Sequence, residues 1–344
     1  GDSWKHGGGT VWGWMSYSPK LNLFYYGTGN CGPWNPDYRR DPTTAPGLNK
    51  YTNKYCSSVL ARNATNGHLV WAYQATPQDQ WDFDQVDNPF LINLNVNGKQ
   101  VYALVKSDRN GYFYAWNAAT GELLYQPKKY TPVTWSDHVD MTTGEPVMNK
   151  DALVYTGQKT GEICPFINGN NWFNDSYNPK TGLVYFNSYN RCNSGFTGAK
   201  GTWTPGGHYV LIDFGDSVTG PGGYLGAMQA WNPNTGTRVW SVQSQNYQNR
   251  HPLMSTGGNL IFSGTDQGYF QAVNATNGQT IWKFRTGSGF RNSPVSFIGP
   301  DGKQYIAVIT SEAPSNPAVG DKTAPDDATR YARPGTTLYV FGLP

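Results

Sequence analysis

The sequence has little charge and few stretches that favour helices. Of its 344 residues only 14% are charged, and the formal net charge is +3. The longest basic clusters are the pairs Arg39-Arg40 and Lys128-Lys129, which are too short for a nucleic-acid-binding arm. No apolar run approaches the ~18 residues that span a bilayer. We therefore expect no nucleic-acid partner and no membrane span.

Cysteine is scarce as well. Cys31, Cys56, Cys164 and Cys192 form no CxxC pair and have no zinc-like spacing with the five histidines. An even number of cysteines suits two disulfides and an oxidising compartment, so we expect a periplasmic or secreted protein. The spacing leaves three pairings open.

Turn formers and aromatic residues are abundant instead, with 41 Gly, 23 Pro, 13 Trp, 23 Tyr and 15 Phe. Strands favour aromatic and β-branched residues, and Gly, Asn and Asp favour the turns between strands. The composition predicts an all-β fold.

One unit recurs along the chain. It consists of an apolar strand, an Asn-x-x-(Thr/Asn)-Gly turn and a second strand that ends on a large aromatic residue. Asn folds its side chain onto the turn backbone, Gly supplies a positive φ, and the terminal aromatic can pack between sheets. The four copies are residues 58–71, 112–125, 227–240 and 269–282, and a diverged copy lies at 177–185.

The spacing of the copies predicts a β-propeller. Gly67 and Gly121 are turn glycines of successive copies, and so are Gly236 and Gly278. The separation within each pair is close to the ~40–50 residues of one four-stranded blade. A hairpin-rich sandwich is the alternative, but four near-copies with a terminal aromatic favour a radial array. No linker is evident, so we expect one domain over residues 1–344.

The first residues combine glycine with tryptophan, in Gly7–Trp14. A glycine run lets the backbone approach a flat ligand, and an indole supplies a stacking face. A phosphate cradle is less favoured, because no GxxxxGK[ST] motif is present. A glycine-rich turn with two core tryptophans is the other interpretation, and these residues alone leave both open.

Four segments, in order, resemble the quinoprotein alcohol dehydrogenases, the family of methanol and ethanol dehydrogenases that use pyrroloquinoline quinone (PQQ). They are Gly7–Trp14, Leu21–Asn30, Trp81–Asp84 and Asp108–Gly111. The repeated unit resembles the tryptophan-docking motif of that family's eight-bladed propeller. The resemblance covers essentially the whole chain but only the later part of the family's catalytic domain. It implies a propeller that is incomplete on its N-terminal side, with another chain or segment supplying the missing blades.

The resemblance assigns roles to matching residues. Trp12 matches the floor under the PQQ ring, and Thr10 matches a threonine that hydrogen-bonds the cofactor. Arg109 matches the arginine that reaches the quinone oxygens. Asn171 matches, more loosely, an asparagine at the cofactor edge.

Three further residues match the metal site. Asn30 corresponds to an asparagine whose side-chain oxygen ligates the metal, and Asp82 to the proposed general base. Asp84 stands where lanthanide-using members carry an additional aspartate. Higher ligand charge suits a trivalent ion, so the resemblance favours a lanthanide over Ca²⁺.

The implied function is oxidation of a primary alcohol to an aldehyde, with metal-assisted hydride transfer to PQQ and electrons passed to a c-type cytochrome. The alternative is a non-catalytic or incomplete propeller that serves as a binding scaffold. Each residue also has a simpler interpretation: Asp82 caps a turn, Arg109 pairs with Asp108, and Asn30 is a loop residue.

The resemblance also bears on the cysteines. Cys164 and Cys192 resemble a pair found in the family, and Cys31 and Cys56 suggest an added local disulfide, worth ~3 kcal/mol for a loop of this length. The family's early-blade metal-binding glutamate and adjacent-cysteine disulfide have no counterpart in these 344 residues. A tryptophan over the far side of the cofactor is also missing, and Arg250-His251-Pro252 lies near its place.

Overall fold

The computed structural model describes residues 5, 7–39, 53–245, 249–311 and 332–343. Strands make up nearly all of the regular structure, which confirms the predicted all-β class. η2 (Pro36–Tyr38) and η3 (Lys150–Ala152) are single 3-10 turns. In the described part of the chain, no helix has the length and apolarity to cross a membrane.

The chain divides into two compact units, which we describe separately. The first comprises Gly1–Trp172, Arg191–Val218 and Asn234–Gly236, and the second comprises Phe173–Asn190, Thr219–Pro233 and Thr237–Pro344. The prediction of one domain over residues 1–344 stays a prediction.

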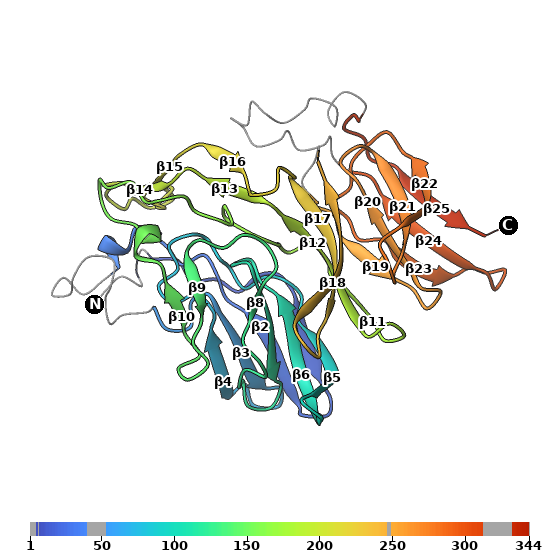
Figure 1. Cartoon of the computed structure of the whole chain (residues 1–344), viewed down its shortest axis with the longest axis horizontal. Coiled ribbons are helices and arrows are strands. Elements are labelled where there is room, and N and C mark those ends of the chain that lie inside the picture. The colour runs from blue at the N-terminus through green and yellow to red at the C-terminus, as the bar shows by residue number, and fades with distance from the viewer. Residues whose placement is uncertain (1–4, 6, 40–52, 246–248, 312–331, 344) are drawn as a thin grey trace. The chain divides into compact units, whose positions relative to one another are not determined.

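Two four-stranded antiparallel sheets dominate the first unit, in blue and green in Figure 1. Each sheet has its strands in chain order, as in a propeller blade. The strands are β1 (Met15–Ser18), β2 (Leu23–Gly27), β3 (Ser58–Asn63) and β4 (Leu69–Gln74), then β5 (Phe90–Val96), β6 (Lys99–Ser107), β7 (Tyr112–Asn117) and β8 (Lys128–Lys129). Three two-stranded pairs accompany them: β9 (Ser136–Val139) with β10 (Pro146–Met148), β13 (Arg191–Asn193) with β16 (Ser217–Thr219), and β14 (Phe196–Gly198) with β15 (Ile212–Phe214).

The second unit contains two more four-stranded sheets and one of three strands. The first runs β11 (Ser176–Asn178), β12 (Leu183–Tyr189), β17 (Gly226–Asn232) and β18 (Thr237–Ser244). The second runs β19 (Leu253–Ser255), β20 (Leu260–Gly264), β21 (Tyr269–Asn274) and β22 (Thr280–Arg285). The last contains β23 (Val295–Ile298), β24 (Gln304–Ile309) and β25 (Leu338–Gly342).

The repeated unit forms the third and fourth strands of its sheets, as β3–β4, β17–β18 and β21–β22. In the first copy the side chain of Asn63 accepts from the backbone N–H of Thr65, and Gly67 closes the turn with φ 74°. The copy at 112–125 differs, because its second strand is reduced to a bridge between Trp116 and Leu123. The segment at 177–185 forms the β11–β12 hairpin, but these are the first and second strands of their sheet, so its position differs from that of the four copies.

The terminal tryptophan of one copy packs on the turn of the next. Trp71 Nε1 donates to the carbonyl of Ala118 at 3.0 Å, and a Cβ at Gly121 would lie 2.7 Å from the Trp71 ring. In the second unit Trp240 makes the same bond to Ala275. The docking role predicted for these aromatics is therefore confirmed within each unit.

Both disulfides pair in chain order. Cys31 bonds to Cys56 and Cys164 bonds to Cys192, which resolves the three possible connectivities.

Candidate active site

The register of the first two sheets gathers the predicted site residues. Met15 at the start of β1 lies opposite Tyr26 near the end of β2, and Ser58 at the start of β3 lies opposite Gln74 at the end of β4. The second sheet likewise pairs Phe90 with Val105. The segments before β1, after β2, between β4 and β5, and between β6 and β7 therefore leave their sheets at corresponding ends. These segments carry Thr10, Trp12, Asn30, Asp82, Asp84 and Arg109.

Asp84 is the centre of the site. Its carboxylate accepts from Asn30 N at 2.6 Å, from Trp12 Nε1 at 2.9 Å and from Arg109 Nη1 at 3.4 Å. The residue is fully buried. Gly29 permits this approach, because a Cβ there would collide with the Asp84 carboxyl group. Three segments of the chain thus converge on one carboxylate.

The Asn30 side chain lies beside Thr10, Trp12 and Asp84. Its hydrogen-bond network is consistent when the amide oxygen accepts from Thr10 Oγ1 at 2.5 Å and from Trp12 Nε1 at 3.1 Å, while the nitrogen donates to Asp84 Oδ2 at 3.3 Å. The backbone of Asn30 is left-handed, with φ 53°. Asn30 is exposed, so its amide is accessible from solvent.

Arg109 joins the two aspartates. Its Nη2 donates to Asp82 Oδ2 at 2.7 Å, and its guanidinium carbon lies 5.9 Å from the centroid of the Trp12 ring. The simpler pairing of Arg109 with Asp108 is wrong, because Asp108 pairs with Lys106 at 3.2 Å. Asp82 also has a left-handed backbone, with φ 67°, and its side chain keeps 14% of its surface exposed.

Buried negative charge exceeds buried positive charge around the site. Among the described residues, Arg109 is the one cation that pairs with both Asp82 and Asp84, since Lys106 pairs with Asp87 and Asp108. Burial, Asp84 and Asp79 raise the pKa of Asp82 to about 8, although Arg109 acts in the opposite direction. Burial also raises the pKa of Asp79, to about 6. The full cluster contains the carboxylates Asp79, Asp82, Asp84, Asp87 and Asp108 and the cations Arg39, Lys106 and Arg109.

The sequence interpretation missed the polar layer behind the site. Lys106 Nζ donates to Gln85 Oε1 at 2.9 Å, and Gln85 Nε2 donates to Asp108 Oδ1 at 2.8 Å. Asp87 Oδ2 accepts from Arg109 N at 3.1 Å. The W-D-F-D-Q-V-D run gives no signal that separates these inner carboxylates from the outer ones. The one available signal was that three aspartates lie close together in this run.

Asn171 is not brought into the hydrogen-bond network of Asp84. Its Oδ1 accepts from the backbone of Trp172, and the carbonyl of Trp172 accepts from Trp14 Nε1 at 2.5 Å. The segment therefore lies beside the Gly7–Trp14 motif, and a role of Asn171 toward the cofactor stays a prediction.

The donors fit a hard cation. Asp82 and Asp84 offer carboxylate oxygens, the ligands that Ca²⁺ and lanthanides take. The Asn30 amide lies beside Asp84 with its nitrogen toward the carboxylate, and it would turn its oxygen to that side to ligate a cation. The two carboxylates share one guanidinium, so a cation would balance the remaining charge. Among the described residues, one set of three His, Cys, Asp or Glu ligands clusters closely, namely Glu162, Cys164 and Cys192, and its two sulfurs form a disulfide.

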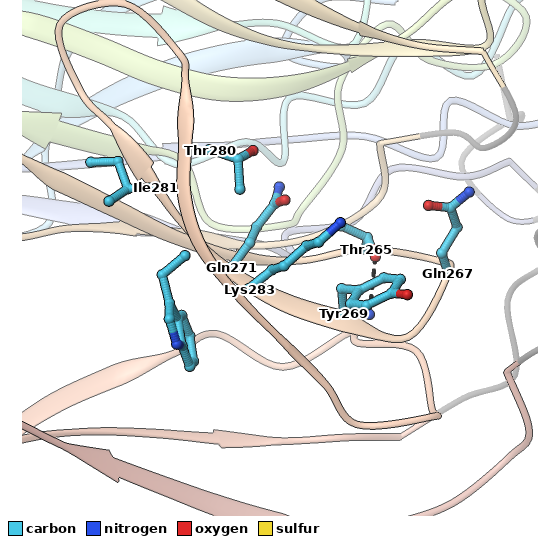
Figure 2. A pocket seen from close by; sticks show the side chains of 8 residues that line it. Thr265, Gln267, Tyr269, Gln271, Thr280, Ile281 and Lys283 are labelled. Atoms are coloured by element: carbon cyan, nitrogen blue, oxygen red, sulfur yellow. Dashed lines mark hydrogen bonds between the residues drawn. The ribbon is translucent and has the colours of Figure 1, made fainter.

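The groove next to Thr10 and the half-buried Trp12 suit a flat ligand. Gly7–Gly9, Thr10 and Tyr55 line a cavity of about 330 Å³. A different pocket, on strands β21 and β22 of the second unit, is shown in Figure 2. Gln271, Lys283 and Tyr269 are among the residues that line it, and no carboxylate is among them.

Comparison with known proteins agrees with this geometry. Residues 1–145 match the family model described as the β-propeller domain of glucose/ethanol/alcohol dehydrogenase, which is named for PQQ. Residues 226–304 match the model of outer membrane protein assembly factor BamB. A lanthanide-dependent methanol dehydrogenase of Methylacidiphilum fumariolicum is 36% identical over 352 residues, covering 100% of this chain and 55% of that protein. This chain is similar over its whole length to PQQ-dependent alcohol dehydrogenases.

Two further relatives extend the comparison. A quinoprotein ethanol dehydrogenase of Pseudomonas putida is 33% identical over 355 residues, covering 100% of this chain and 55% of its own length. The solved structure of a europium-containing methanol dehydrogenase superposes with a TM-score of 0.88 at 33% identity, covering 100% of this chain and 61% of that one. The propeller fold is thereby confirmed. The chain spans a little over half the length of the relatives that it matches.

Proposed function

We propose that this chain carries the cofactor and metal site of a quinoprotein dehydrogenase that oxidises a primary alcohol to an aldehyde. The observation that supports this most strongly is the convergence of Trp12, Asn30, Asp82 and Arg109 around the buried carboxylate of Asp84. A propeller that served only as a scaffold would have no need for two aspartates beside a single arginine.

The excess of buried carboxylate charge supports a resident cation. Unpaired buried charge is costly, so the site must take up either a proton or a metal ion. The raised pKa of Asp82 supports the uptake of a proton in the absence of metal. A cation held by Asp82, Asp84 and Asn30 would lower that pKa again and keep the Asp82 carboxylate ionised.

When bound, PQQ supplies the acceptor for the two electrons of the alcohol, and the metal supplies a Lewis acid beside it. Asp82 accepts the hydroxyl proton, a role that typically contributes ~10²–10⁴-fold. Its Oδ2 is held by Arg109, so Oδ1 is the atom free of that contact and suited to receive the proton.

Arg109 and Trp12 orient the cofactor. The guanidinium is fixed by both aspartates and can add charge-assisted hydrogen bonds to carbonyl oxygens. The Trp12 indole is fixed at its Nε1 by Asp84, which leaves a ring face for stacking. The hydroxyl of Thr10 donates to the Asn30 side chain, so Thr10 lies at the same edge of the site.

Three parts of the proposal concern the surroundings of the enzyme. Two disulfides suit a periplasmic or secreted location. We propose a c-type cytochrome as electron acceptor by analogy with the family, and a lanthanide as the preferred metal because Asp84 adds a second carboxylate. One of the similar proteins is named as a dehydrogenase subunit.

A dye-linked assay tests the proposal. Activity with a primary alcohol should require both PQQ and metal, and should be lost in Asp82→Asn. Asp137→Asn, which changes an exposed aspartate on β9 of the same unit, is the matched control and should retain activity. Activity that persists in Asp82→Asn would remove Asp82 as the base, and a failure to bind either PQQ or metal would refute the function.

A further inference from the structure

The Cys31–Cys56 disulfide adjoins the metal-binding segment directly. Cys31 follows Asn30 in sequence and is almost fully buried. Cys56 Sγ lies 3.7 Å from the carbonyl oxygen of Gly29, the residue before Asn30. The disulfide therefore covalently anchors the chain at the residue that presents the amide ligand.

The other end of the disulfide leads to the two aspartates. Ser57, next to Cys56, donates its hydroxyl to the carbonyl of Phe83, which lies between Asp82 and Asp84. The same hydroxyl lies 3.4 Å from Asp79 Oδ2, and Asp79 accepts from the backbone N–H of Phe83 at 2.9 Å. Residues 56 and 57 thus join the segment of Asn30 to the segment of the aspartates.

The backbone of this joint is strained. Tyr55 and Ser57 have φ values of 70° and 47°, a left-handed region that side chains other than glycine rarely adopt. Such residues persist where surrounding structure holds them, and they gather at functional sites. A hydrogen bond from Thr28 Oγ1 to the carbonyl of Tyr55, at 2.6 Å, reinforces the same joint.

We propose that the Cys31–Cys56 disulfide is a positioning element of the metal site, holding Asn30 beside Asp84. This inference rests on the proposed function. Groups that orient metal ligands typically change metal affinity ~10–100-fold when they are removed. The effect should therefore appear in metal binding itself, before any catalytic step.

The chain contains a matched control for this test. Cys164–Cys192 spans 28 residues against 25 for Cys31–Cys56, so the two disulfides restrict the unfolded chain to a similar degree. Its cysteines lie outside the segments of Asn30 and the aspartates. A loss of general stability would affect the two double variants alike, whereas a positioning role would separate them.

The experiment measures Tb³⁺ affinity of the full chain by indole-sensitised luminescence. Cys31→Ser/Cys56→Ser should raise the Kd for Tb³⁺ ~10–100-fold, with Cys164→Ser/Cys192→Ser remaining near wild type. Thr28→Val, which keeps the disulfide but removes the hydrogen bonds of the Thr28 hydroxyl to Tyr55 and Ser58, should weaken binding in the same direction by a smaller factor. It provides the test if the first double variant fails to fold.

The outcomes of this experiment distinguish a failure of the inference from a failure of the proposed function. If the wild-type chain binds Tb³⁺ and the two double variants lose affinity equally, the disulfide has only a structural role and the inference is wrong. If Thr28→Val is the folded variant and binds Tb³⁺ as wild type does, the inference is wrong as well. If the wild-type chain binds no Tb³⁺, the proposed metal site fails and the inference falls with it.

Discussion

Replacing Asp84 with asparagine should reduce the preference of the site for a trivalent over a divalent ion. The substitution removes one negative charge and keeps one oxygen, which can accept from either Asn30 N or Trp12 Nε1, because these two groups donate to different oxygens of the carboxylate. Arg109 retains its 2.7 Å contact with Asp82. The lost hydrogen bond weakens the binding of both metal ions alike, so the change in the ratio of their Kd values should be electrostatic.

The expected size follows from the burial of Asp84. Two unit charges about 4 Å apart interact by about 4 kcal/mol at an effective dielectric constant of ~20. A trivalent ion loses three such interactions and a divalent ion two, so La³⁺ loses about 4 kcal/mol more than Ca²⁺, or ~10³-fold in Kd. Allowing for solvent relaxation, we expect the ratio of the Ca²⁺ to the La³⁺ Kd to fall by ~10²-fold or more.

Competition of La³⁺ and Ca²⁺ against bound Tb³⁺ measures this ratio in wild type and in Asp84→Asn. A second readout is independent of metal. Asp84 is one of the groups that raise the pKa of Asp82 to about 8, so that pKa should fall in the metal-free variant, as followed by carboxyl ¹³C NMR. An unchanged La³⁺-to-Ca²⁺ ratio would refute the role of Asp84 in metal choice. An unchanged Asp82 pKa would refute the electrostatic description of the site.

Three further predictions concern activity, pH and stability. Asp82→Asn should lower dye-linked turnover by ~10²-fold or more without a change in Tm, as measured by calorimetry; comparable turnover would contradict its role as base. Burial lowers the pKa of His251, so its contribution to stability is present above its ordinary pKa and is lost as the pH falls below it. His251→Gln should therefore flatten the decline of the unfolding free energy between about pH 7 and 5 in urea titrations, and an equally steep decline would show that another group titrates. Trp71→Ala should lower the free energy of unfolding by about 3–5 kcal/mol, because the indole packs on Gly121. Trp282→Ala should lower it by less, because Trp282 is 38% exposed, and equal losses would contradict the role of packing on the turn.

The fold was largely predictable because its signals are local. An Asn that caps its own turn and a Gly with positive φ act within five residues, so each hairpin is visible in the sequence. The turn at Asp140–Gly144 was missed because aspartate replaces asparagine there, although Asp140 Oδ1 accepts from Thr142 N in the same way. The missing second strand of the copy at 112–125 was also not foreseen. Pro127, which has no N–H to donate, lies between the Trp116–Leu123 bridge and β8, where pairing with β7 resumes.

The site was predictable only in part, for a different reason. The order of the four motifs predicted Trp12, Asn30, Asp82 and Arg109 as site residues. It did not predict that Asp84 lies at their centre. That position depends on contacts between residues 25 to 72 apart, which no local pattern encodes. The buried Lys106 layer behind the site was missed on the same grounds, since a lysine on a strand is normally expected to face solvent.

The most direct test is anomalous diffraction from crystals of the chain soaked with PQQ and a lanthanide. The proposal predicts one strong lanthanide peak at ligand distance from oxygens of Asp82, Asp84 and Asn30, with flat tricyclic density over the Trp12 indole. A lanthanide bound elsewhere, or a quinone that lies away from Trp12, would contradict the account.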